Sequence, residues 1–318
     1  MKHSYKIDRI EQLSFLPWDG PIRLHNPDVM FYHFEYYGND RNNIPEIPYE
    51  IHFGRWIADG GRVDSGRFAL KHRKFIANTS MEHNLSFLMA NMAKLEVGDC
   101  VYDPFVGSGS LLVSAAHFGA YCFGTDIDYL LLHGLTKNSR YGKTVRDVDE
   151  SVLGNFKQYL VQNRYIDVFA GDSSLSNIRK NFIFDAVITD PPYGRREARE
   201  RIGSKKNYII PEELVAAHIP SKLEYEINDI YKDLFEFSIT NLKIGGRLVF
   251  WAPYFHSSNE EEAEKMKPIS LFKENHDSVL EKELEKHFKH DSFKFVGFVE
   301  QSLTLKYSRN LIVLERIK

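Results

Sequence analysis

From residue 49 onward, short apolar runs alternate with stretches in which apolar residues recur at helical spacing. The runs indicate strands and the spaced stretches indicate helices, so the pattern predicts a parallel, doubly wound, Rossmann-like α/β fold. Two successive strands near the end predict an antiparallel pair at one edge of a seven-stranded sheet. Strands are predicted at residues 100–102, 121–125, 166–170, 184–189, 247–252, 293–303 and 310–315. Helices are predicted at residues 80–93, 110–118, from about 129, and at 151–162, 223–242 and 278–287.

A polar stretch precedes this pattern. Residues 38–48 (GNDRNNIPEIP) contain two prolines and three asparagines, a composition typical of a linker. We therefore predict a domain boundary near residue 45. Residues 1–45 then form a leading segment and linker, small for an independent domain, and residues 46–318 form the main domain.

The most distinctive stretch lies at the end of the predicted strand 184–189. The strand is followed by Asp190, Pro191, Pro192 and Tyr193. Two successive prolines have no N–H groups and cannot continue a sheet ladder. They turn the Asp190 carboxylate, the Pro191 carbonyl and the Tyr193 ring out of the carboxyl end of the strand, where open α/β sheets bind ligands.

Composition excludes several classes of protein. The formal net charge is −3, so the chain is not a basic nucleic-acid coat, and contact with a polyanion must rest on local patches. Cys100 and Cys122 lack metal-type spacing and fit a reducing compartment, so no metal site is expected. The N-terminus lacks an apolar signal region, and residues 111–123 are too short to span a bilayer. We therefore expect a cytoplasmic protein.

Carboxylates follow three predicted strands. Asp103 opens the loop DPFVGSGS (residues 103–110), Asp126 and Asp128 end the next strand, and Asp172 ends the third. The loop lacks the third glycine of a pyrophosphate-binding fingerprint, and Asp103 would repel phosphates. Acidic strand ends suit a ligand with an amine, a cationic centre and a ribose, as in S-adenosylmethionine.

Each carboxylate has an expected partner in that ligand. Asp103 is assigned to the methionine amine, Asp126 to the ribose hydroxyls, and Asp172, with Ser173, to the adenine amino group. A tight turn without a ligand also explains a lone G-x-G, and Asp126, Asp128, Asp172 and Ser173 also suit helix caps. The expected cofactor-binding residues are Asn78, Thr79, Ser80, Asp103, Phe105, Gly107, Gly109, Asp126, Ile127, Asp128, Asp172 and Ser173.

The proline loop suits methylation of an exocyclic amine, whose lone pair is delocalised into its ring. Acceptors for both N–H bonds favour the tetrahedral nitrogen and carry away positive charge as the methyl arrives. The Asp190 carboxylate and the Pro191 carbonyl are candidate acceptors, and Asp190 is also a candidate general base. Tyr193 is a candidate for stacking on an extruded base, although core packing also explains an aromatic there. The expected catalytic residues are Asp190, Pro191, Pro192 and Tyr193.

These motifs resemble the class I S-adenosylmethionine-dependent amino methyltransferases, which include DNA adenine-N6, DNA cytosine-N4 and RNA guanine-N2 enzymes. The larger set of sequence motifs, over residues 49–253, resembles the catalytic subunit of the eukaryotic tRNA guanine-10 N2-methyltransferase family. The stretches that carry this resemblance are Phe53–Ala58, Phe75–Met81, His117–Ala120, Gly124–Asp128 and Thr189–Arg195.

The resemblance implies methylation of the N2 amine of a tRNA guanine at position 10, with Asn78, Thr79 and Ser80 beside the cofactor. It also implies a THUMP RNA-binding module before the catalytic domain, and Pro21–Gly38 is similar to the last part of one. Residues 1–45 are therefore expected to be a remnant of that module. A small zinc-binding activator protein is the implied partner, and the apolar strand Ile166–Ala170, expected at a sheet edge, suits its docking by strand addition.

A basic run follows the proline loop directly. Residues 195–206 (RREARERIGSKK) carry four more positive than negative charges, which suits either a phosphate clamp beside the base pocket or a solvated loop. The expected RNA-binding residues are Arg195, Arg196, Arg199, Arg201, Lys205 and Lys206, with Lys71, Arg73 and Lys74 as candidates to extend the patch.

Three alternatives to a tRNA enzyme remain open at this point. A DNA adenine or cytosine amino methyltransferase shares the loop chemistry. A non-catalytic RNA-binding or scaffolding subunit could keep the same fold, although the intact Asp190 and Tyr193 speak against it. An NAD enzyme is the weakest, because the glycine loop lacks the pyrophosphate pattern.

Overall fold

The protein is described by a computed structural model in which the chain forms two compact units, Met1–Gly61 and Arg62–Lys318. The structure describes residues 3–17, 19–23, 25–38, 40, 43–60, 65–143, 145–175, 178–194, 197–205, 211–215, 220–255, 277–304 and 307–318.

The first unit contains a helix and a two-stranded antiparallel sheet. Helix α1 spans His3–Glu11, and strands β1 (Phe31–Tyr36) and β2 (Glu50–Arg55) pair along their whole length. The polar residues 38–48, expected to link two domains, therefore connect two paired strands of this unit. The division between the units falls after Gly61, whereas composition predicted it near residue 45.

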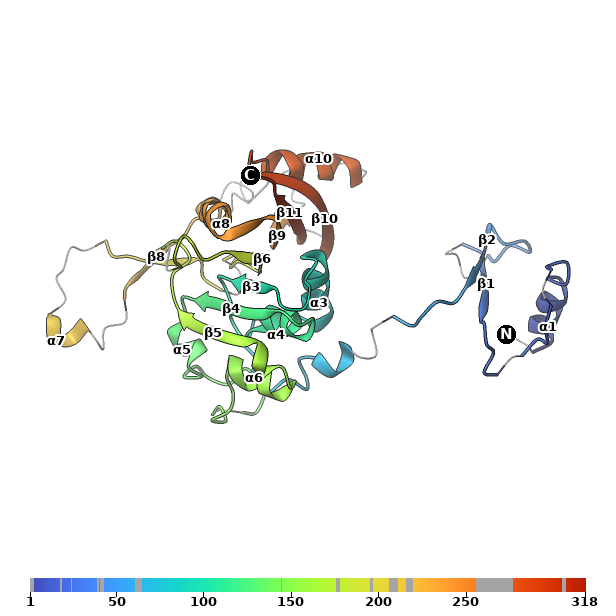
Figure 1. Ribbon diagram of the computed structural model, residues 1–318, viewed down its shortest axis with the longest axis horizontal. Coiled ribbons are helices and arrows are strands. Elements are labelled where there is room, and N and C mark those ends of the chain that lie inside the picture. The colour runs from blue at the N-terminus through green and yellow to red at the C-terminus, as the bar shows by residue number, and fades with distance from the viewer. Residues whose placement is uncertain are drawn as a thin grey trace. The chain divides into compact units, whose positions relative to one another are not determined.

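The second unit is built on a seven-stranded sheet (Figure 1). The strand order is β10-β11-β9-β6-β3-β4-β5. The pairs β3–β4, β4–β5, β3–β6 and β6–β9 are parallel, while β9–β11 and β10–β11 are antiparallel. The strands span Cys100–Asp103 (β3), Tyr121–Asp126 (β4), Tyr165–Ala170 (β5), Phe184–Thr189 (β6), Leu242–Phe255 (β9), Phe293–Thr304 (β10) and Tyr307–Arg316 (β11).

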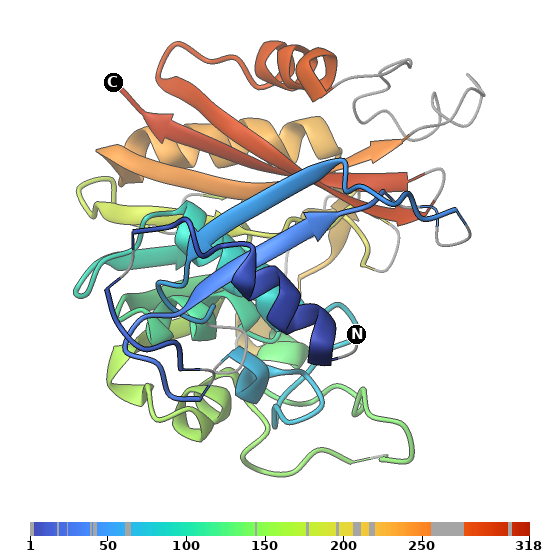
Figure 2. The same ribbon diagram turned by 90° about the vertical axis from the view of Figure 1, so that its right-hand side faces the viewer.

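The predicted architecture, a mostly parallel sheet with an antiparallel edge pair, is confirmed. The long orange and red strands in Figure 2 are β9, β10 and β11, and β9 is longer than the apolar run 247–252 predicted. The helix predicted from residue 223 begins only at Ile227. The residues before it are held in a second small sheet, because β8 (Lys222–Glu224) pairs with β7 (Glu200–Ile202).

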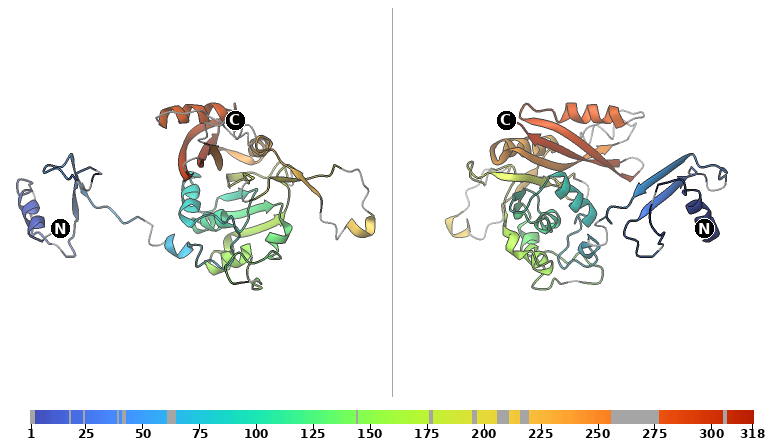
Figure 3. Two further views of the ribbon diagram at one scale, coloured as in Figure 1. Left: turned by 180° about the vertical axis from the view of Figure 1, so that it is seen from behind. Right: turned by 45° about the vertical axis from the view of Figure 1, so that its right-hand side comes forward.

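Helices cover both faces of the large sheet (Figure 1, Figure 3). The helices α3 (His83–Met92), α4 (Ser110–His117), α5 (Tyr129–Leu132) and α6 (Val152–Gln158) bury side chains in one core cluster. The helices α8 (Ile227–Asn241) and α10 (Asp277–His287) bury side chains in the other. The described residues also form a short helix α7 (Glu212–Val215) and the 3-10 turns Gly66–Phe68 and Gln162–Arg164. Trp251 of β9 is fully buried and donates its indole N–H to the Met89 sulfur at 3.1 Å.

The order of strands reverses between β3 and β6. The chain leaves β3 toward β4 and β5, then returns to place β6 on the other side of β3. At such a switch point the loops after the two strands diverge and leave a crevice at their carboxyl ends. Asp103 ends β3 and Thr189 ends β6, and the Thr189 hydroxyl donates to Asp103 Oδ1 at 2.7 Å.

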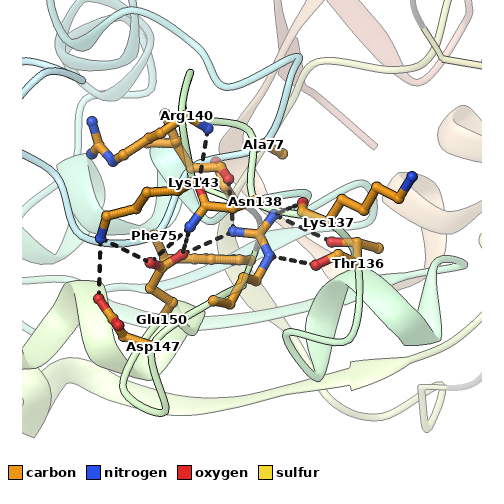
Figure 4. A network of polar contacts seen from close by, with 12 residues as sticks. Phe75, Ala77, Thr136, Lys137, Asn138, Arg140, Lys143, Asp147 and Glu150 are labelled. Carbon is orange, nitrogen blue, oxygen red and sulfur yellow. Dashed lines mark hydrogen bonds and ion pairs between the residues drawn. The ribbon is translucent and has the colours of Figure 1, made fainter.

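Residues 75–77 lead to the crevice and are fixed by a buried polar network (Figure 4). Arg146 donates to the Ile76 carbonyl at 3.2 Å and to Glu150 Oε2 at 3.1 Å, and only 4% of each charged side chain is exposed. The Arg146 guanidinium also lies over the Phe75 ring, and Asn138 donates to both Glu150 oxygens. The network holds the segment that carries Thr79 and Ser80 without using either side chain.

None of the helices in the described residues combines the length and the apolar character needed to cross a membrane.

Candidate functional site

A cavity of about 460 Å³ opens where the loops after β3 and β6 diverge. Its volume falls within the range of roughly 300–1,000 Å³ that small-molecule sites occupy. The walls come from the segment before α3, the glycine loop, the proline loop and the β10–β11 hairpin. The lining residues are Thr79, Ser80, Met81, Glu82, Leu85, Asp103, Phe105, Val106, Gly107, Ser108, Ser110, Leu111, Asp190, Pro191, Pro192, Tyr193, Glu197, Gln301, Leu303, Thr304, Tyr307 and Arg309.

Asp103 is the most deeply buried carboxylate in the cavity wall, with 1% of the residue exposed. Its Oδ1 accepts bonds from the Thr189 hydroxyl and the Phe105 amide, whereas its buried Oδ2 has no partner in the described residues. Burial raises the pKa of Asp103 to about 7, with the two hydrogen bonds opposing the rise and the charges of Asp126 and Asp190 adding to it. An unpartnered buried acceptor is costly, so this oxygen suits a cationic donor from a ligand.

The glycine loop brings backbone close to the neighbouring strand end. Gly107 and Gly109 have φ angles of 52° and 77°, which side chains other than glycine rarely adopt. The Gly107 amide donates to Asp126 Oδ2 at 2.7 Å, and the Asp128 amide donates to Asp126 Oδ1 at 2.8 Å. Both oxygens of Asp126 therefore have backbone partners, and these bonds counter the rise that burial causes in its pKa.

Serine hydroxyls line the cavity beside the glycine loop. The Ser80 and Ser108 hydroxyls lie 2.5 Å apart, and the Ala77 amide donates to the Ser80 oxygen. The Thr79 hydroxyl donates to Glu197, which follows the proline loop, so segments more than 100 residues apart meet across this part of the cavity. Burial raises the pKa of Glu197, and the bond from Thr79 opposes that rise.

Some expected cofactor residues do not line this cavity. Asp172 is buried, and its oxygens accept from the Ser174 and Ile202 amides, because β7 packs over it. Asp128 caps α5 by accepting from the Leu131 amide, which is the structural role that its position at a helix start also suits. The other expected residues outside the cavity lining are Asn78, Gly109, Asp126, Ile127 and Ser173.

All four residues expected to be catalytic line the cavity. The Tyr193 hydroxyl donates to Asp190 Oδ1, and Arg309 Nη1 donates to Asp190 Oδ2 at 2.9 Å. Burial raises the pKa of Asp190, and the charge of Arg309 opposes that rise. Each carboxylate oxygen can accept a further bond, so Asp190 keeps acceptor capacity for an amine in the cavity.

Arg309 and its neighbours were missed by sequence reasoning, which treated residues 306–309 as the connection between two strands. Arg309 shares a strand face with Leu311 and Val313, both of which are buried in the core. A charged residue at an apolar position of a period-2 strand is the signal that could have identified it. Its guanidinium lies 4.3 Å from the Trp251 ring centroid and donates to Gln301 Oε1 at 2.8 Å.

The expected RNA-binding residues are only partly described. Arg199 pairs with Glu224 at 3.3 Å, while Arg201 and Lys205 are exposed. Arg195, Arg196 and Lys206 lie outside the described residues. Among the residues thought to extend the patch, Lys71 is exposed and Lys74 pairs with Asp149.

Arg73 cannot extend that patch, because it is fully buried. Its guanidinium donates to the Ser110 hydroxyl at 2.6 Å and to the Phe68 carbonyl, which places it behind the glycine loop rather than at the surface.

Family models match both units of the chain. Residues 71–208 match the model described as "RMKL-like, methyltransferase domain". Residues 1–62 match the model described as "Tmrp11 THUMP N-terminal domain".

Curated relatives match the chain over almost its whole length. The Bos taurus protein named tRNA (guanine(10)-N(2))-methyltransferase TRMT11 is 43% identical over 316 residues, which are 98% of this chain and 63% of that protein. The chain belongs to this methyltransferase family. The Schizosaccharomyces pombe tRNA (guanine(10)-N(2))-methyltransferase is 37% identical over 246 residues, which are 77% of this chain and 49% of that protein. The chain therefore spans less than two thirds of the length of these relatives.

Proteins of known structure are less similar to this chain than the curated relatives are. TrmN from Thermus thermophilus aligns with a TM-score of 0.44 and 17% identity, over 84% of this chain and 57% of that chain. The class I methyltransferase fold is therefore assigned from the strand order and the family model rather than from this likeness.

Replacing Arg309 by methionine should destabilise the protein in a pH-dependent way. The unpaired Asp190 carboxylate would cost about 3 kcal/mol of unfolding free energy at pH 8. Without Arg309 the raised pKa of Asp190 rises further, so the carboxyl is protonated as the pH falls, and the loss of stability should shrink toward pH 5.

Urea unfolding at both pH values measures this effect. The double variant Arg309→Met/Asp190→Asn should recover most of the loss at pH 8. A loss that is equal at both pH values would instead assign the contribution of Arg309 to its packing on Trp251.

Proposed function

We propose that this protein transfers the methyl group of S-adenosylmethionine to the exocyclic N2 amine of a guanine in tRNA, at position 10. The observation that carries the proposal is the shared cavity. Asp103, which has one buried carboxylate oxygen without a partner in the described residues, and the whole Asp190–Tyr193 loop line the same 460 Å³ cavity, so the methyl donor and the amine that accepts the methyl group can meet there.

The residues present fit S-adenosylmethionine at one end of the cavity. Asp103 Oδ2 is buried without a partner and suits the amine of the methionine moiety. The Ser80 and Ser108 hydroxyls, which belong to residues of the same lining, suit its carboxylate. Asp126 lies outside the lining but accepts a bond from the amide of the lining residue Gly107, and it stays the proposed partner of the ribose. When bound, the cofactor supplies an electrophilic methyl group on a sulfonium centre.

The proline loop is proposed to bind and orient the amine that receives the methyl group. The Asp190 carboxylate and the Pro191 carbonyl accept the two N–H bonds of the amine and turn its lone pair toward the methyl group. Positive charge would develop on the nitrogen as it takes up the methyl group, and the Asp190 carboxylate would stabilise that charge. Asp190 then accepts the surplus proton, while the Tyr193 ring stacks on the base.

The substrate class rests on the relatives and on the first unit. The matched relatives are named as enzymes of guanine 10 in tRNA. We infer that residues 1–45, expected to be a remnant of a THUMP-like module and linker, belong together with the rest of the first unit, which matches a THUMP N-terminal domain. Arg201 and Lys205 are exposed and follow the proline loop in the sequence, and together with the rest of the basic run they suit the tRNA backbone.

The strand β5 is the proposed docking site of a small zinc-binding activator protein. It is the last strand of the sheet order, β4 is its one partner strand among the described residues, and Ile166 is 47% exposed. The Val168 amide is bonded to the Tyr165 hydroxyl and the Asp167 carboxylate of its own strand rather than to a further strand. An apolar edge of this kind favours strand addition by a partner.

Asp190→Asn should abolish methyl transfer while leaving the cofactor site intact. We expect kcat to fall about 10²- to 10⁴-fold with unmodified tRNA, because an acceptor and proton carrier are lost. The affinity for S-adenosylhomocysteine, measured by calorimetry, should change little.

The matched control is Asp229→Asn, which removes an exposed carboxylate on α8, and it should transfer methyl groups normally. Mapping of the modified nucleotide, with duplex DNA as a competing substrate, tests the choice of tRNA. Loss of both cofactor binding and transfer in Asp190→Asn would assign Asp190 a structural role.

Affinity for S-adenosylmethionine should fall as the pH drops below about 7. Because the pKa of Asp103 is raised to about 7, the carboxyl is ionised above that pH and neutral below it, whereas the cofactor amine stays protonated. Each pH unit below the pKa should weaken binding by up to about tenfold.

Calorimetry between pH 5.5 and 8.5 measures this dependence. Asp103→Asn should bind weakly at every pH and show a flat profile. A flat profile in the unaltered protein would remove Asp103 from cofactor binding.

Co-expression of this chain with the activator protein tests the proposed docking on β5. The chain alone should be poorly soluble and should become soluble and active with the activator, and Ile166→Asp should weaken that rescue by placing a charge on the edge strand. A well-behaved, active monomer would contradict the proposed docking.

A further inference from the structure

The β10–β11 hairpin forms the wall of the cavity that faces the proline loop. Gln301, Leu303 and Thr304 line the cavity from β10, and Tyr307 and Arg309 line it from β11. None of these side chains is proposed to contact the amine that accepts the methyl group. They line the same cavity as Asp190, so a base held by Asp190 would be within this lining.

The Arg309 guanidinium bonds one side chain of this wall, Gln301, and one of the facing proline loop, Asp190. Arg309 Nη1 donates to Asp190 Oδ2 at 2.9 Å, and Arg309 Nε donates to Gln301 Oε1 at 2.8 Å. The guanidinium is itself held against the Trp251 ring, 4.3 Å from its centroid. Asp190 and Gln301 are therefore held in one arrangement by a planar, rigid donor group.

The contact with Arg309 also decides which way the Gln301 amide faces. A guanidinium has donors only, so the amide oxygen must face it and the amide NH2 group must face elsewhere. Gln301 lines the cavity, and in the described part of the chain its NH2 group has no hydrogen-bond partner. The wall beside the amine acceptor Asp190 thus offers an amide donor.

We propose that Gln301, oriented by Arg309, donates a hydrogen bond to O6 of the target guanine and thereby selects the base. The inference rests on the proposed function, because it requires guanine N2 at Asp190. Guanine presents its O6 acceptor and its N2 amine on the same Watson–Crick edge, so acceptors at Asp190 and a donor at Gln301 match that edge. Adenine carries an amine at position 6, which would face the Gln301 NH2 group donor to donor.

Arg309 is a positioning residue in this arrangement. It contacts Asp190, which accepts from the amine, and Gln301, which donates to O6, but it does not itself contact the base. A purely structural role for Gln301 would be to anchor Arg309 through its amide oxygen. The two roles separate in Gln301→Glu, which keeps an oxygen for Arg309 and the size of the side chain but loses the NH2 donor.

The test compares two tRNA transcripts, with guanine or 2-aminopurine at position 10. 2-Aminopurine keeps the N2 amine and lacks O6. The unaltered protein should favour the guanine tRNA by about tenfold or more in kcat/KM, because a site built to bond a polar group rejects an analogue without it. Gln301→Glu and Gln301→Leu should both lose most of this preference. Ser302→Ala, at the exposed next position of β10, is the matched control and should keep it.

Equilibrium binding of the same two tRNAs in the presence of S-adenosylhomocysteine gives a second readout without turnover. If the unaltered protein methylates neither tRNA, the proposed function fails, while the ratio of the two dissociation constants still tests Gln301. A guanine preference that Gln301→Glu retains, or no preference in the unaltered protein, would overturn the inference. A preference retained by Gln301→Glu but lost by Gln301→Leu would assign Gln301 the anchoring role alone.

Discussion

Crowding of carboxylates at one edge of a buried sheet is the constraint on which the rest of this structure depends. Asp103 ends β3, Asp190 follows the neighbouring parallel strand β6, and Asp126 ends β4 on the other side of β3. Burial raises the pKa of all three, so each ionised group requires compensation from its surroundings. The compensation differs at each position, and these differences separate the proposed roles.

Each oxygen of Asp126 receives one backbone amide, which leaves acceptor capacity for a neutral partner such as a ribose hydroxyl. Asp190 receives a hydroxyl and a guanidinium, which favour its ionised form next to a developing cation. Asp103 accepts hydrogen bonds on one oxygen, and its other oxygen has no partner among the described residues, which suits a cationic donor from a ligand. Three aspartates thus suit three roles, because their hydrogen-bond donors differ. Asp126 suits a ribose hydroxyl, Asp190 suits catalysis, and Asp103 suits a bound cation.

The antiparallel edge pair gives the fold more than an extra pair of strands. It places Arg309 within reach of a carboxylate that follows β6, across the intervening β9. The Arg309 guanidinium therefore links β11 to the proline loop, although the two segments lie far apart in the sequence. In a different segment, the buried pair of Arg146 and Glu150 fixes the chain just before the lining residues Thr79 and Ser80. The cavity is therefore held by charges outside the motifs that define it.

The sequence by itself determined the architecture and the central loops. Alternating apolar runs identified the strands, because burial of both sheet faces demands them, and the prolines after β6 identified the catalytic loop, because they end a ladder wherever they occur. The linker near residue 45 was predicted from composition alone, which does not reveal that β1 and β2 pair across it.

Only the tertiary structure decided which strand-end residues share one cavity. Asp172 has the same local signature as Asp103, but β7 packs over it, while Arg309 and Gln301 have no motif at all and still line the cavity. Whether a side chain at a strand end meets a ligand depends on contacts between segments separated in the sequence, by 30 residues for Ile202 with Asp172 and by 119 for Arg309 with Asp190. Local patterns along the chain do not encode such contacts, because they arise from the order in which the strands assemble.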